Sequence, residues 1–265
     1  GNFAIYLNLI KNMDSIAIGS SLDITLSKVR KVKVDGKFIS PLSLTEYLGI
    51  ISLTPLMDKI FIEGSAIRRK FFDKITWIFV SAHANNVRSY EKAVKERNNL
   101  LKENSSDTVW FDNIEKQIVN FGTQILINRF KVLKLLNKQI KDNIINFPKA
   151  IMSLDGKIEN IFNESSTIYY FKEEYIKALK ENRKIDFYRG STTIGVHKTD
   201  LEVIYKEKDM IASLCSTGEQ KSLLISIIFS VAKSYKNHTQ LSPILLLDEV
   251  FSHLDNDKKE SLSRE

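Results

Sequence analysis

Hydrophobic and polar positions along this chain follow different periods in different regions, and each period predicts a different kind of element. Before about residue 64 the apolar residues alternate with polar ones, which is typical of half-buried strands. Between about residues 82 and 180 apolar residues recur at every third or fourth position, which predicts amphipathic helices. After Lys184 both patterns occur, so we expect an α/β protein with its helices concentrated in the middle.

The first region predicts several strands and then a helix. The expected strands are residues 3–7, 22–26 and 50–53. Residues 32–39 predict a hairpin because Asp35 and Gly36 form a favoured turn dipeptide. Ser65 lies where an N-cap is expected, ahead of apolar residues at helical spacing.

The middle region predicts two helices of unequal length. One apolar face runs over residues 90–101, a polar break follows at 104–107, and a second face covers residues 114–144 before Pro148 ends it. A long helix after a shorter one favours an antiparallel helical arm that projects from a head. Two helices packed flat on a core are the alternative.

The last region returns to mixed structure. Residues 201–205 alternate and lead through the turn 206–209 into 210–212, which predicts a second hairpin. Residues 243–247 are wholly apolar, as expected for a strand covered on both faces of an α/β sheet. The expected regions are a β-rich part of a head over 1–80, a helical arm lobe over 81–180, and the rest of the head over 181–265.

Two segments of this last region carry candidate chemistry. The polar stretch 214–221 opens an apolar helix, and the apolar strand ends at Asp248 and Glu249. A Ser-x-Gly loop at a helix N-terminus can hold a phosphate, and carboxylates at a strand end can hold Mg²⁺. In this order the segments resemble the two downstream motifs of an ABC-type ATPase head. Each also has an ordinary explanation: Ser216 with Glu219 is a capping box, and a strand can simply end in solvated acids.

The ABC-type resemblance implies that the loop faces the nucleotide of a second subunit. Ser216 Oγ and the Gly218 N–H are then expected at the γ-phosphate, where glycine lets the backbone approach closely. Glu219, Lys221 and Asp255 are assigned to the same contact in trans. Lys221 is explained equally well as a solvated residue.

The carboxylate pair has separate expected roles. Asp248 is the candidate Mg²⁺ ligand, and Glu249 is the candidate general base that orients the attacking water. A Gly-x-x-x-x-Gly-Lys-[Ser/Thr] phosphate loop is not found, because the Gly-Lys pairs at 36–37 and 156–157 are each followed by an apolar residue. We interpret the chain as an incomplete head whose phosphate loop lies upstream of Gly1; a gene that has lost its start is the alternative.

Charge and composition limit the possible partners. The 265 residues carry a net charge of +7, which fits either a polyanionic partner or the coding bias that also makes Lys, Asn and Ile abundant. Three cations lie together on the first turn of a helix, an unfavourable place that a bound anion would relieve. The candidate DNA-binding residues are Arg68, Arg69, Lys70, Lys92 and Lys95, with Arg97 further along the arm. A solvated face, with pairs such as Glu91 and Lys95, is the alternative.

The sequence also bears on compartment. One cysteine, Cys215, excludes an internal disulfide and suits a reducing cytosol, so a cytoplasmic protein is expected. No run of about 18 uncharged apolar residues occurs, so no membrane partner is expected.

Five segments in order resemble the RecF family of bacterial recombination mediators, which is related to the SMC-type ATPases. They are residues 54–58 with Gly64 and 68–73 ("P-x-x-D … G … RR-x-x-x-D"), Tyr90 with 95–101 ("Y … RN-x-x-L"), 192–200 ("T-x-x-G-P-H-R-x-D"), 216–221 and 246–255. Val196 and Lys198 depart from the third pattern, which has Pro and Arg there.

The resemblance implies a weak, DNA-stimulated ATPase that uses ATP and Mg²⁺. It also implies an ATP-dependent homodimer that clamps single-stranded and gapped DNA, with RecO and RecR as partners. Without the phosphate loop, the chain is expected neither to bind ATP productively nor to close a dimer, so enzyme activity stays open. The alternatives are a nucleotide-independent module that binds DNA or protein, and a transporter subunit. The helical arm and the cations at 68–70 count against the transporter.

Overall fold

The structure, a computed structural model, describes residues 2–11, 14–22, 29–103, 107–142 and 147–248. The chain separates into two compact units, residues 1–49 and residues 50–265. In the described ranges, no helix has the length and apolar character that a membrane crossing needs.

The first unit is a four-stranded antiparallel sheet. Its strands, in spatial order, are β1 (Phe3–Lys11), β2 (Asp14–Leu22), β3 (Arg30–Val34) and β4 (Lys37–Ile39), and a 3₁₀ helix, η1 (Pro41–Glu46), follows. Asp35 and Gly36 have φ of 46° and 78°, so the predicted hairpin turn is confirmed. The Asp35 carboxylate accepts the Ala17 N–H at 2.8 Å and fastens the turn to β2. The expected strand at 22–26 overlaps β2 only at Leu22, and the rest lies outside the described residues.

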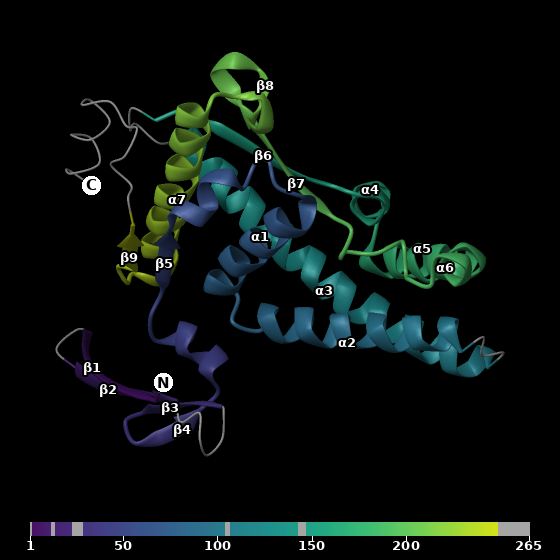
Figure 1. Ribbon diagram of the computed structural model, residues 1–265, viewed down its shortest axis with the longest axis horizontal. Coiled ribbons are helices and arrows are strands. Elements are labelled where there is room, and N and C mark those ends of the chain that lie inside the picture. Colours follow the sequence, from purple (N-terminus) through teal and green to yellow (C-terminus); the bar gives the residue numbers. More distant parts are fainter. Residues whose placement is uncertain (1, 12–13, 23–28, 104–106, 143–146, 249–265) are drawn as a thin grey trace. The chain divides into compact units, whose positions relative to one another are not determined.

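The second unit contains the head, which is built from two small sheets and the helices that cover them. Its elements are β5 (Ile50–Leu53), η2 (Pro55–Lys59), α1 (Ser65–Phe79), β6 (Ala150–Asp155), β7 (Asp200–Tyr205), η3 (Lys206–Lys208), β8 (Met210–Ile211), η4 (Ala212–Leu214), α7 (Thr217–Thr239) and β9 (Ile244–Leu247). Strands β5 and β9 pair in parallel, and β6, β7 and β8 pair antiparallel in that order. Helix α7 lies beside β5 and β9 in Figure 1, and its Leu223, Leu224 and Ile227 are fully buried in the head core.

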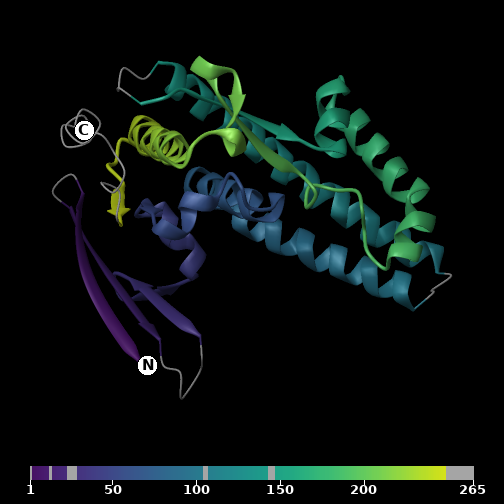
Figure 2. The ribbon, with the colours of Figure 1, turned by 45° about the horizontal axis from the view of Figure 1, so that its top comes forward.

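The arm lobe has a core of its own. Its helices are α2 (His83–Lys102), α3 (Thr108–Lys141), α4 (Lys157–Glu164), α5 (Ile168–Glu181) and α6 (Arg183–Arg189). Helices α2 and α3 run side by side in Figures 1 and 2, which confirms the predicted helical arm. Helix α3 contributes Ile118 and Leu126 to the arm core and Val132 and Leu136 to the head core. One continuous helix therefore belongs to both.

Two expectations about local structure were wrong. The N-cap of α1 is Gly64, and Ser65 is the first helical residue; its hydroxyl instead accepts a hydrogen bond from Arg69 at 3.1 Å. Strand β9 is not covered on both faces, because Leu246 and Leu247 are 54% and 37% exposed. Within the described residues β9 pairs only with β5, so less of the strand is covered than its apolar sequence predicts. The region boundaries near residues 80 and 180 stay predictions.

Candidate functional site

The loop that precedes α7 is held by its own helix cap. Ser216 is the N-cap: its hydroxyl accepts the Glu219 N–H, and the Glu219 carboxylate accepts the Ser216 N–H at 2.9 Å. The predicted capping box is therefore confirmed. Ser216 and Thr217 are exposed, and a Cβ built on Gly218 would meet nothing within 4 Å. The helix thus presents its positive end to open space.

A second interaction fixes the same loop from outside the helix. Lys208, in the turn between β7 and β8, forms an ion pair with Glu219. The hydrogen bond from Lys208, together with those from Ser216, lowers the pKa of Glu219 to about 2. Glu219 is therefore a carboxylate at neutral pH, and its oxygens are already used within the chain.

Lys221, one turn into α7, is buried. Its side chain is 6% exposed, and its ammonium is 3.6 Å from the Asp58 carboxylate. The alternative interpretation of Lys221 as a solvated residue is therefore wrong, because the residue packs into the head. Gln220 is also buried, and its side chain donates to the Cys215 carbonyl at 2.8 Å, which helps to hold the backbone just before the N-cap. Sequence reasoning gave Gln220 no role.

The carboxylate site is described only in part. Asp248 follows β9, its backbone N–H donates to the Leu53 carbonyl at 3.0 Å, and its side chain is exposed. One exposed carboxylate fits a Mg²⁺ ion that takes its other oxygens from phosphate and water. Glu249 and Asp255 lie outside the described residues, so the predicted general base and the predicted contact in trans stay predictions. No group of three or more metal-ligating side chains is found in the described part of the chain.

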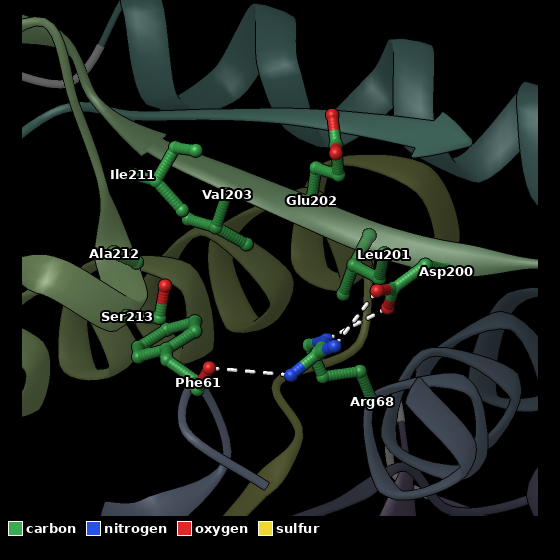
Figure 3. Close-up of a pocket in the computed structure, with 9 residues that line it drawn as sticks. All are labelled: Phe61, Arg68, Asp200, Leu201, Glu202, Val203, Ile211, Ala212 and Ser213. Carbon is green, nitrogen blue, oxygen red and sulfur yellow. Dashed lines mark hydrogen bonds and ion pairs between the residues drawn. The ribbon is translucent and has the colours of Figure 1, made fainter. Parts of the chain in front are cut away.

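The cations at the start of α1 are not alike. Arg68 forms a bidentate ion pair with Asp200 on β7, with both N–O distances at 2.7 Å, and also donates to the Phe61 carbonyl (Figure 3). This hydrogen-bonded pair raises the pKa of Arg68. The anion that the helix start was expected to need is therefore supplied, for Arg68, by the chain itself. A cavity of about 150 Å³ lies beside this pair.

The other candidate DNA-binding cations have no carboxylate partner among the described residues. Arg69 donates to the Thr199 carbonyl at 2.6 Å and to the Ser65 hydroxyl, which are both neutral acceptors. Lys70, Lys92 and Lys95 are exposed. The expected ion pair between Glu91 and Lys95 is not among the observed ones.

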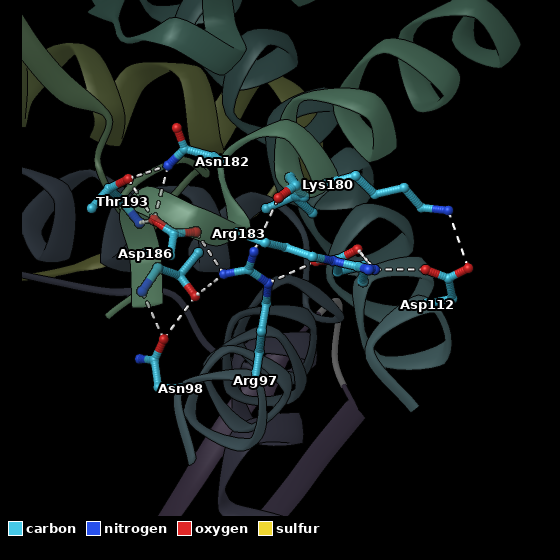
Figure 4. Close-up of polar contacts among 11 residues, drawn as sticks. Arg97, Asn98, Asp112, Lys180, Asn182, Arg183, Asp186 and Thr193 are labelled. Atoms are coloured by element: carbon cyan, nitrogen blue, oxygen red, sulfur yellow. Dashed lines mark hydrogen bonds and ion pairs between the residues drawn. The ribbon is translucent and has the colours of Figure 1, made fainter. Parts of the chain in front are cut away.

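Arg97 was expected to contact phosphate along the arm, and that expectation is wrong. Its side chain is fully buried and pairs with Glu115 at 3.0 Å and Asp186 at 2.7 Å (Figure 4). It also donates to the Thr192 hydroxyl and the Leu179 carbonyl. All of these partners belong to this chain, so the guanidinium is not available to a phosphate. The helical pattern had placed Arg97 on the apolar face, and that signal was the correct one.

A second buried network lies where α1, α2 and α3 meet. Arg129 pairs bidentately with Asp73, with both distances at 2.8 Å, and His83 lies 2.8 Å from the same carboxylate. Burial raises the pKa of Asp73, but the Arg129 charge and the hydrogen bonds outweigh it and lower the pKa to about 2. Nearby, the Tyr90 hydroxyl donates to His197 Nδ1 at 2.7 Å.

Curated proteins similar to this chain share one name, although no family model matches. The chain is 35% identical over 264 residues to "DNA replication and repair protein RecF" of Rhizobium rhizogenes, covering 98% of this chain and 70% of that protein. It is 38% identical over 240 residues to the protein of the same name from Rickettsia bellii, covering 90% of this chain and 66% of that protein.

Solved structures show the same fold. One, described as the recombination mediator protein RecF-ATPrS in the RecFOR pathway, superposes with a TM-score of 0.84 at 19% identity and covers 97% of this chain and 70% of that one. A second, described as RecF-ATP, gives a TM-score of 0.83. The predicted fold, an ABC-type ATPase head with an inserted helical arm lobe, is confirmed.

Proposed function

This chain belongs to the RecF family of DNA replication and repair proteins, and from that premise we propose that it takes part in an ATP-gated dimeric clamp on single-stranded and gapped DNA. The chain spans about two thirds of the length of the relatives that it matches. The observation that carries the proposal is the positive end of α7, where the N-cap Ser216 and the first helical residue Thr217 are exposed and a Cβ built on Gly218 would meet nothing within 4 Å.

The loop suits a phosphate that comes from outside the chain. Its backbone is fixed by the capping box and by Lys208, so it needs no rearrangement to receive a ligand. The Ser216 hydroxyl keeps a free proton to donate, because in the cap it acts as an acceptor. The first N–H groups of a helix have no partner inside the helix, so they are available to an anion. The γ-phosphate of ATP held by a second subunit is the ligand that we assign to this loop.

Bound ATP with Mg²⁺ would supply the negatively charged γ-phosphate that joins the two subunits of the clamp. Asp248, exposed at the end of β9, is the residue that we assign to the Mg²⁺ ion. Glu249 would orient the attacking water as a general base, and Asp255 would reach the partner subunit. The DNA contact is assigned to the cations Arg69, Lys70, Lys92 and Lys95. RecO and RecR are the proposed protein partners.

Two substitutions at Ser216 test the shared pocket. Asp and Asn are both good N-caps, so both should keep α7 folded, but Asp places a negative charge where the γ-phosphate would lie. The test uses a longer form of the chain that includes a phosphate loop. We expect this form to become a dimer when ATP is added, and analytical ultracentrifugation measures its oligomeric state. Ser216→Asn, which loses the hydroxyl but stays uncharged, should weaken this dimer less than Ser216→Asp, which should lose it, and Glu249→Gln should trap it. A dimer that forms equally well with Ser216→Asp would reject the pocket.

One observation favours the alternative, a module that binds DNA or protein without nucleotide. Glu219 and Lys221, both assigned to ATP, are paired with Lys208 and Asp58 of their own chain. Such a module would bind DNA equally well with and without ATP in the same protein. The clamp predicts that ATP strengthens DNA binding, so the comparison separates the two functions.

A further inference from the structure

A cavity of about 110 Å³ lies where α1, α2 and α3 meet the segment that follows Gly195. By this measure a water needs about 10–15 Å³, so the cavity has room for several waters or a small oxyanion. The side chains that give it its character are Arg69, Lys70, Asp73, Glu91, Arg129 and His197.

The charges in this cavity are not balanced. Arg129 and Asp73 neutralise each other through their bidentate pair. Arg69 uses only Nη1, towards the Thr199 carbonyl and the Ser65 hydroxyl. Its Nε and Nη2 groups have no hydrogen-bond partner among the described residues. Burial and the nearby Arg129 charge lower the pKa of Arg69, and they outweigh the charges of Asp73, Asp200 and Glu159, which raise it.

The rim adds further positive charge. Lys70 lines the cavity and is exposed, and no hydrogen bond or ion pair of its side chain is found in the described part of the chain. Glu91 opposes it as the one lining carboxylate that no observed ion pair engages. Among the lining residues, the unpaired charges are therefore two positive, Arg69 and Lys70, against one negative, so the site favours an anion.

The remaining wall is rigid and neutral. His197 accepts the Tyr90 hydroxyl at Nδ1, 2.7 Å away, and donates from Nε2 to the Thr192 carbonyl at 2.9 Å. Gly195 has a φ of +146°, and a Cβ there would collide with the Tyr90 hydroxyl oxygen. The close approach fixes the segment that carries His197 and Lys198, so the cavity is formed before any ligand arrives.

We propose that this cavity binds a phosphate group, with the Arg69 guanidinium as its main ligand and Lys70 at its mouth. The free Nε and Nη2 groups of Arg69 form the planar fork that matches two phosphate oxygens. The phosphate can belong to a nucleic-acid backbone or be a free ion. The nucleic-acid source rests on the DNA contact proposed above, and the free ion does not.

Calorimetry with inorganic phosphate tests the site directly. Arg69→Gln should weaken binding about 10- to 100-fold, because a charge-assisted hydrogen bond is removed. Lys70→Gln should weaken it several-fold. It disturbs none of the observed contacts, so it decides the question even if Arg69→Gln fails to fold. Lys177→Gln, which removes an exposed charge on α5, is the matched control and should change nothing.

A salt titration with a gapped duplex identifies the source of the phosphate. If the DNA backbone supplies it, the log–log salt slope should fall by about 0.9 for every phosphate that a variant no longer neutralises. Weaker phosphate binding with an unchanged slope would identify the free ion. The proposal is overturned if neither measurement separates the Arg69 and lysine variants from wild type. A wild type that binds phosphate but no DNA would reject the DNA contact and leave this site standing.

Discussion

The imidazole of His197 accepts a hydrogen bond from Tyr90 on one side and donates one to the Thr192 carbonyl on the other. Only the neutral ring can do both, because protonation at Nδ1 would remove the acceptor. Burial lowers the pKa of His197 to about 4, and the charges of Lys198 and Arg69 act in the same direction. The protonation state of His197 is therefore set by its surroundings in the fold, because an exposed histidine has a higher pKa.

Stability should depend on pH through this histidine. Its folded-state pKa lies below the unfolded value of about 6.5, so it stabilises the fold above pH 6.5 and that contribution is lost as the pH falls towards 4. The full contribution is at most about 3 kcal/mol. Urea unfolding of wild type and His197→Gln between pH 7 and 4.5 measures it. The stability difference between the two should shrink as the pH falls, and a constant difference would contradict this assignment.

Four helices of the arm are joined by polar contacts around three fully buried charged side chains, Arg97, Glu115 and Asp186. Arg97 on α2 pairs with Glu115 on α3 and with Asp186 on α6, and it donates to the Leu179 carbonyl on α5. Arg183 connects α6 to the same Glu115 at 2.6 Å (Figure 4). Each buried charge has an opposite charge in contact. The network therefore ties α6 to α2 and α3 through ion pairs.

Removing one charge from this network should be costly. Asp186→Asn leaves Arg97 buried with one carboxylate instead of two, and breaking such a pair costs about 3–5 kcal/mol. The free energy of unfolding, from urea denaturation monitored by circular dichroism, measures the loss. Asp112→Asn is the control, because its carboxylate is 38% exposed and contacts Lys180 and Arg183 at the surface. If the two substitutions lowered the free energy of unfolding equally, burial would not explain the destabilisation.

In the second unit, the arm and the head share one long helix. Helix α3 runs through both cores, and the Arg68–Asp200 pair ties α1 to β7. Strand β7 continues into the turn that carries Lys208, which holds Glu219 at the candidate nucleotide loop. A continuous series of contacts and chain connections therefore runs from α1 to that loop.

The proposed DNA contact predicts that DNA binding is strongly salt-dependent. Lys92 and Lys95 are exposed on α2, and replacing both with Gln should reduce the log–log salt slope by about 0.9 for each duplex phosphate that they neutralise. Fluorescence anisotropy with a gapped duplex measures the slope. Lys236→Gln on α7 is the control. If all variants share the wild-type slope, the positive charge of α2 is a solvated face and not a DNA surface.

The sequence determined the local elements wherever a period or a turn signal was strong. The hairpin at Asp35 and Gly36, the arm helices and the capping box at Ser216 all follow from interactions between residues close in the chain. Ordered motifs were sufficient to identify the family, because each combines several residue types at fixed spacing. The placement of Arg97 on an apolar helical face could also be read from the sequence.

Tertiary structure alone decided which charges are free. Arg68, Arg69 and Lys70 are neighbours in sequence and look alike, yet Arg68 is neutralised by Asp200, 132 residues away, while the others have no carboxylate partner among the described residues. Lys221 is buried against Asp58, and the anion-favouring cavity unites three helices with a distant loop. A charge acts through space, so its effect depends on groups that only the fold brings within a few ångströms.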